Sequence, residues 1–116
     1  MARAYSVRLV ALTIGMPPKW VDNLLSHHAL PGVARARQGV ERCITDDGLL
    51  AIELVRLLAT ELGSRLETAA AIAREAVESR SASQLRFVTR SGVAIDFTFV
   101  EIEQRLRDQI VEAVDS

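Results

Sequence analysis

Residues that end helices divide much of this 116-residue chain into short segments. Gly15 and the following Pro17-Pro18 pair, the dipeptide Pro31-Gly32, and Gly63 each interrupt a run in which apolar residues recur at helical spacing. Glycine favours the left-handed conformation that closes a helix, and proline suits the first turn of the next one. The predicted helices span about 6–14, 18–28, 46–62 and 64–78.

Capping residues support these boundaries. Ser6 can accept a hydrogen bond from the free amide of Arg8 or Leu9, and Thr45 can cap a helix whose first turn carries two aspartates. Ser64 and Thr98 each stand three residues before a glutamate, the pattern of a capping box. The second box predicts a further helix that begins near residue 98.

Two segments alternate with a period of two and predict short hairpins. Residues 33–36 and 40–44 flank a turn at 37–39, and residues 85–90 and 93–97 flank Ser91-Gly92. The expected fold class is mainly α with small β-hairpins. We expect the domains to be 1–78 and 85–116, joined by a polar connector over 79–84.

The formal net charge of −1 conceals an asymmetry. Residues 1–45 carry a net charge of +4 and residues 46–116 carry −5, so the first part of the chain can attract a polyanion. A single cysteine excludes an internal disulfide, and the two adjacent histidines have no third ligand nearby for a metal. The sequence shows no catalytic triad and no phosphate-binding loop, so we expect neither an enzyme nor a cofactor. It also has no apolar run long enough for a membrane span, so we expect no membrane-spanning segment.

The order of these motifs resembles the MerR-type winged helix-turn-helix over residues 5–78. The resemblance rests on Tyr5-Ser6-Val7, Ala11, Gly15 and the segment 17–21, followed by Leu30-Pro31-Gly32, a basic hairpin, and the segment 44–47. In size the chain is similar to small MerR-like proteins of the BldC type and to the DNA-binding parts of excisionases and antitoxins. It lacks the long dimerisation helix of larger members, and the family supplies no counterpart for 85–114.

This resemblance implies double-stranded DNA as the partner. Small residues at positions 11 and 15 would let the first two helices cross closely, with the second helix in the major groove and the hairpin on the backbone. Trp20 is also compatible with a place in the core or beneath the wing. The implied groove contacts are Lys19, Trp20, Asn23 and His27, the implied wing contacts are Arg35, Arg37, Gln38 and Arg42, and Arg8 would add a phosphate contact.

The C-terminal segment concentrates apolar and aromatic residues. Because a two-stranded hairpin is marginal alone in water, either the last helix folds back on it or a second chain covers it. We expect the second arrangement, a homodimer formed through 85–114. The candidate interface residues are Phe87, Ile95, Phe97, Phe99, Ile102, Leu106 and Ile110.

These expectations combine into a cytoplasmic, nucleoid-associated bacterial protein that represses transcription as a DNA-bound homodimer. Two alternatives remain open at this stage. In one, the chain is an antitoxin whose C-terminal segment binds a toxin while its helix-turn-helix represses its own operon. In the other, it is a recombination factor of excisionase type that bends DNA.

Overall fold

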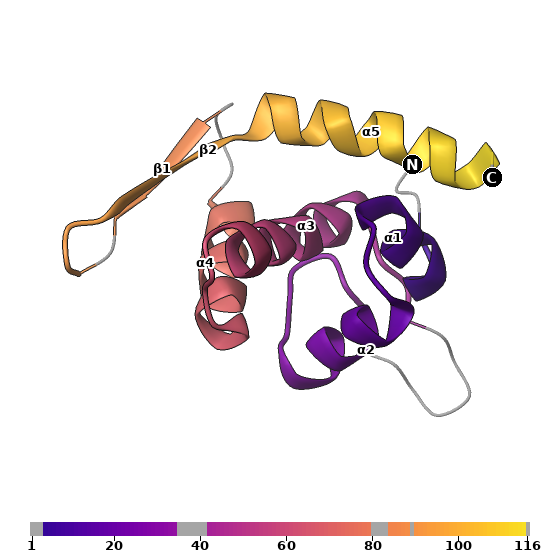
Figure 1. Ribbon diagram of the computed structural model, residues 1–116, viewed down its shortest axis with the longest axis horizontal. Helices are drawn as coiled ribbons and strands as arrows, with labels where there is room; N and C mark the ends of the chain where they lie inside the picture. The colour runs from indigo at the N-terminus through magenta and orange to yellow at the C-terminus, as the bar shows by residue number, and fades with distance from the viewer. Residues whose placement is uncertain (1–3, 35–41, 80–83, 89, 116) are drawn as a thin grey trace.

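The computed structural model describes residues 4–34, 42–79, 84–88 and 90–115, and for residues 84, 85 and 87 it describes the backbone alone. This part of the chain is mainly helical, as predicted (Figure 1). None of its helices is long and apolar enough to cross a bilayer. The helices are α1 (Val7–Ile14), α2 (Pro18–His27), α3 (Asp46–Glu61), α4 (Leu66–Glu78) and α5 (Phe99–Asp115), and the strands are β1 (Gln84–Val88) and β2 (Ala94–Thr98).

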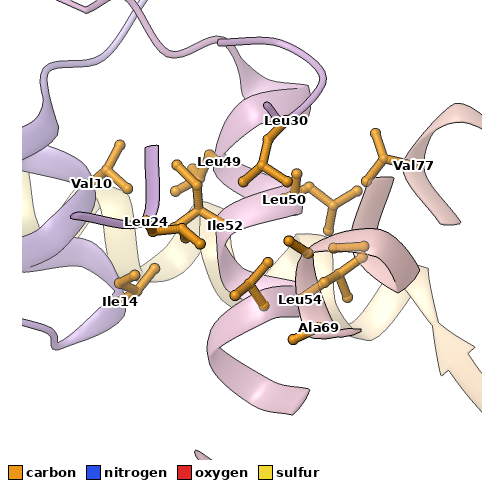
Figure 2. Packing of buried hydrophobic residues seen from close by; sticks show 14 of the residues in the cluster. Val10, Ile14, Leu24, Leu30, Leu49, Leu50, Ile52, Leu54, Ala69 and Val77 are labelled. Atoms are coloured by element: carbon orange, nitrogen blue, oxygen red, sulfur yellow. The ribbon is translucent and has the colours of Figure 1, made fainter. Parts of the chain in front are cut away.

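Helix α3 lies at the centre of the molecule. All residues from Gly48 to Val55 are buried, because neighbouring elements cover the helix on several sides. Side chains of α1, α2, α3 and α4 converge in one apolar cluster (Figure 2). α4 contributes a fully buried row of small residues, which lets it approach α3 closely: Ala69, Ala70, Ala73 and Ala76.

The turn between α1 and α2 depends on backbone conformation rather than on close packing at the glycine. Gly15 has φ +73°, and a Cβ added there would meet no atom within 4 Å. The expectation that Gly15 is small so that two helices can cross is therefore wrong. Gly15 is required because other residues rarely adopt positive φ, whereas Ala11 is fully buried.

The helix caps predicted at Ser6 and Thr45 are present, and the one predicted at Ser64 is not. Ser6 accepts a hydrogen bond from the Leu9 amide at 3.1 Å, and Thr45 accepts one from the Gly48 amide at 3.4 Å. The predicted capping box at Ser64 is wrong, because α4 begins at Leu66 with Arg65 at its N-cap. The Ser64 amide instead donates to the Leu58 carbonyl at 3.0 Å, after the chain turns back at Gly63.

Strands β1 and β2 pair in antiparallel register, with Leu85 opposite Phe97 and Phe87 opposite Ile95. The hairpin joins α5 directly and extends away from the helices (Figure 1). Phe97 is buried at the end nearest the helices, whereas Val93 near the turn is 57% exposed. The apolar covering of the hairpin therefore decreases toward its turn.

Helix α5 packs along α1 and also contacts α3. Phe99, Leu106 and Ile110 face inward, and all three are buried in the chain's own core. Phe97 joins them, with its ring centroid 6.0 Å from that of Phe99. These four residues were expected at a dimer interface, as were the partly buried Ile95 and Ile102. The expectation has to be corrected for the buried four, because each is at most 7% exposed and packs mainly in the core of its own chain.

A buried carboxylate also joins α5 to α3. The side chain of Glu53 is fully buried and accepts hydrogen bonds from Arg56 on α3 and, at 3.0 Å, from Arg105 on α5. The hydrogen bond from Arg56 to Glu53 raises the pKa of that arginine above its ordinary value. A buried charge requires such partners, so the two guanidinium groups make this position tolerable for Glu53.

Candidate nucleic-acid interface

The outer side of α2 presents a row of polar side chains. Lys19, Asn23 and His27 recur every four residues and are all exposed. On the opposite side Val21 and Leu24 are buried against the core, which fixes the rotation of the helix. We refer to Lys19, Asn23 and His27 as the α2 outer stripe.

A local hydrogen bond orients one member of this stripe. Nδ1 of His27 lies 2.8 Å from the carbonyl oxygen of Asn23, one turn earlier. Because a carbonyl can only accept, Nδ1 carries the proton, and Nε2 is the ring nitrogen that remains for an external partner. The ring is thus held against the backbone of the preceding helical turn.

Trp20 lies beside the stripe but is only partly exposed. Its side chain packs against the apolar cluster. The structure thus favours the core placement that the sequence had left open for this residue.

The ends of the predicted basic hairpin are held by backbone pairing. Ile44 forms bridges with both Tyr5 and Val33, and the Ala34 amide donates to the Cys43 carbonyl at 2.9 Å. The Tyr5 and Ile44 backbones exchange hydrogen bonds of 2.7 and 3.1 Å. The predicted wing contacts Arg35, Arg37 and Gln38 lie outside the described residues.

A contact between two glycines fixes the segment before this hairpin against α3. A Cβ on Gly32 would lie 2.3 Å from the Gly48 amide nitrogen, and one on Gly48 would lie 2.6 Å from the Gly32 carbonyl oxygen. That same carbonyl accepts hydrogen bonds from the Thr45 amide at 2.8 Å and from the Thr45 hydroxyl at 2.9 Å. Sequence reasoning missed Gly48, because the need for a glycine within a helix is evident only when the residue that packs against it is known.

Arg42, a predicted wing contact, binds α2 within the chain. Its guanidinium forms an ion pair with Asp22 and donates to the Ser26 hydroxyl at 3.0 Å. The Arg42 side chain is 19% exposed. The structure therefore places Arg42 as a residue that positions the end of the hairpin beside α2. Sequence reasoning did not identify Asp22, which lies far from Arg42 along the chain.

A groove of about 580 Å³ separates α2 from this segment. Its walls include His27 and His28 at the end of α2, Ala34 and Arg42. Arg74 of α4 supports the loop beneath it by donating to the Ala29 carbonyl at 3.1 Å. The groove is lined by both the end of α2 and the paired ends of the hairpin.

Around α2 the structure brings together Lys19, Asn23, His27 and Arg42, whereas Arg8 lies exposed in the first turn of α1. The described residues contain no group of three or more His, Cys, Asp or Glu side chains that could hold a metal ion. The outer surface of α2 thus offers hydrogen-bond donors and acceptors on a rigid helix. Comparisons of the chain with protein-family models, with curated proteins and with solved structures found no match.

Proposed function

We propose that the chain is a sequence-specific DNA-binding regulator whose α2 outer stripe enters the major groove. The observation that carries this proposal is the exposure of Lys19, Asn23 and His27 on a helix whose opposite side is buried. An α-helix fits the major groove, where each base pair presents a distinct pattern of donors and acceptors. A helix with a fixed rotation can present the same side chains to that pattern each time.

The chemistry of the stripe suits base recognition. An asparagine side chain can pair with both N6 and N7 of adenine, and a lysine can donate to O6 and N7 of guanine. His27 keeps Nε2 for a base or a phosphate, because Nδ1 is engaged by the Asn23 carbonyl. Asn23 is the central residue of the stripe and is our candidate for the main base contact.

The segment that follows α2 would supply contacts to the DNA backbone. Arg42 binds α2 and Gly32 contacts α3, so the described ends of this segment are held to helices. Along the sequence Arg35, Arg37 and Gln38 lie between these two ends. Phosphate contacts position a protein on DNA, and base contacts give it specificity. Because residues 46–116 carry a net charge of −5, affinity would depend on these few cations.

Selection from random duplex DNA with the full chain tests the proposal. We expect enrichment of one motif, which the variant Lys19→Ala/Asn23→Ala/His27→Ala then binds at least about 100-fold more weakly, because each good base contact contributes about 1–3 kcal/mol. Fluorescence anisotropy at fixed salt concentration measures the loss.

A matched variant carries three substitutions at the same spacing on α5, Gln104→Ala, Asp108→Ala and Glu112→Ala, all at exposed positions. It removes two carboxylates, so electrostatics can only favour its DNA binding. Equal loss in both variants would contradict the assignment to α2. Absence of any enriched motif would contradict sequence-specific binding itself.

A further inference from the structure

The end of the β1–β2 hairpin is an apolar and basic surface that the helices leave uncovered. Val88 and Val93 are each 57% exposed, and Arg90 in the turn is also exposed. Asp96, the acidic residue of the hairpin, binds Arg86 at 2.9 Å. The turn therefore presents valines together with positive charge.

A groove with the opposite charge lies between α3 and α5. It encloses about 600 Å³, and Leu49, Leu50, Leu106 and Ile110 contribute apolar walls. Asp46, Asp47 and Glu103 surround these walls, and Arg107 is the one cation among the described lining residues. Asp46 accepts a hydrogen bond from the Tyr5 hydroxyl at 2.7 Å, and Glu103 pairs with Arg107 at 3.7 Å, so these four charged side chains together contribute a net negative charge. Val111, which is 60% exposed, extends the apolar surface at one side. We refer to this feature as the α3–α5 groove.

We propose that the α3–α5 groove binds the hairpin turn of a second copy of the chain. The turn offers exposed valines and Arg90, and the groove offers apolar walls surrounded by carboxylates, so both the apolar contacts and the charges are complementary. This interface overlaps the one expected from sequence at Leu106 and Ile110, which line the groove. It leaves out Phe97 and Phe99, which are buried elsewhere in their own chain.

The direction of the chain excludes the groove of the same molecule as the partner. β2 runs directly into α5, and the hairpin turn points away from the helix, whereas the groove lies along residues 103–111 of α5 (Figure 1). A two-fold axis near the start of α5 would bring each turn to the other copy's groove. Both contacts then form together, as in a closed homodimer.

A charge exchange tests this arrangement in the absence of DNA, so its outcome is independent of the proposed DNA binding. We expect the wild-type chain to be a dimer at micromolar concentration in sedimentation equilibrium. Arg90→Glu and Asp47→Arg should each raise the dissociation constant at least about tenfold, because each places like charges in both contacts.

Mixing these two variants gives the decisive measurement. In the mixed dimer each contact again joins opposite charges, so we expect a heterodimer with near wild-type affinity. Both substituted positions are exposed, and circular dichroism checks that each variant is folded. A monomeric wild-type chain, or a dimer that neither substitution weakens, overturns the proposal. So does a mixture that stays dissociated.

A disulfide cross-link provides a second, independent measurement. In a Cys43→Ser background, which removes the chain's single exposed thiol, Val93→Cys and Val111→Cys should form an intermolecular disulfide under mild oxidation. Replacing Val111→Cys with Leu62→Cys, at a position 62% exposed at the far end of α3, gives the matched control. Cross-linking of Val93→Cys alone at the same rate would place turn against turn and overturn the proposed contact.

Discussion

Helices α2 and α5 both bury apolar side chains on one side, but they differ in the side chains that they expose to solvent. α2 buries Val21 and Leu24, and α5 buries Phe99, Leu106 and Ile110. The outer side of α2 carries polar side chains. On α5, by contrast, Val100, Val111 and Val114 are each at least 60% exposed.

The difference shows that the buried side chains of a helix determine how it packs in the fold, whereas its exposed side chains determine which partners it can bind. Polar side chains on α2 suit a hydrogen-bonding partner such as DNA. Exposed valines on α5, of which Val111 lines the α3–α5 groove, suit a protein surface. Substitutions on the buried sides should therefore change stability, and substitutions on the exposed sides should change binding.

The largest effect is expected at the buried side of α5. Phe99→Ala should lower the free energy of unfolding by about 3–5 kcal/mol, because it leaves a cavity where a side chain is now 1% exposed. Leu24→Ala on α2 should cost about 2–5 kcal/mol for the same reason. Urea unfolding measures both, and Val100→Ala is the exposed control, with an expected change within about 0.5 kcal/mol. Equal costs for Phe99→Ala and Val100→Ala would show that α5 is not packed as described.

The next effect concerns the carboxylate that joins α3 to α5. Glu53→Gln should lower the free energy of unfolding by about 2 kcal/mol, because it weakens charge-assisted hydrogen bonds to Arg56 and Arg105. The figure is smaller than for a fully buried pair, since Arg105 is 43% exposed. A double-mutant cycle with Arg105→Gln isolates the contact with α5. A coupling energy near zero would show that Glu53 acts through α3 alone.

On the outer side of α2 the expected change is in sequence preference. Asn23→Ala should reduce discrimination at one base position by about 1–3 kcal/mol and leave the other positions unchanged. Competition binding with single-base variants of the selected motif measures this. The free energy of unfolding should change little, because Asn23 is exposed. Uniform weakening at all positions would make Asn23 a phosphate contact instead.

A smaller effect on DNA binding is expected at Arg8, which lies exposed on α1. Arg8→Ala should weaken binding to all sequences and reduce the slope of log affinity against log salt by about one. Arg65→Ala removes the same charge at the start of α4 and serves as the control. If both variants give the same slope, Arg8 makes no specific phosphate contact.

The smallest effect is electrostatic and lies in the exposed hairpin. The hydrogen bond from Arg86 lowers the pKa of Asp96 below its ordinary value of 3.8. Because the pKa is lower in the folded state, the ion pair contributes its full stabilisation at pH values above 3.8. This contribution is lost as the pH falls through the pKa of the folded state. Arg86→Gln should return the pKa of Asp96 toward 3.8, which an NMR titration can follow. An unchanged pKa would show that the pair does not persist in solution.

The sequence was sufficient to predict features set by nearby residues. Ser6 and Thr45 cap helices because their side chains reach amides three residues away, and Gly15 ends α1 because it can adopt positive φ. Helical periodicity likewise placed Val21 and Leu24 on one side of α2 and left the outer stripe on the other.

The sequence was not sufficient where the partner is distant along the chain. Asp22 binds Arg42, Gly48 accommodates Gly32, and Glu53 binds Arg105 across 52 residues. None of these residues has a local pattern that distinguishes it from an ordinary helical residue. Arg42 was therefore expected to contact DNA from the wing, whereas in the structure it binds Asp22 of the same chain.

The sequence by itself determined the ends of the helices to within about two residues and which side of each is apolar, because caps and periodicity are local properties. Only the tertiary structure decided what covers those apolar sides. Phe97, Phe99, Leu106 and Ile110 pack within their own chain, because β2 leads directly into α5 and α5 lies along α1 and α3. An apolar surface requires a cover, and residue types alone do not determine whether the same chain or a second one provides it.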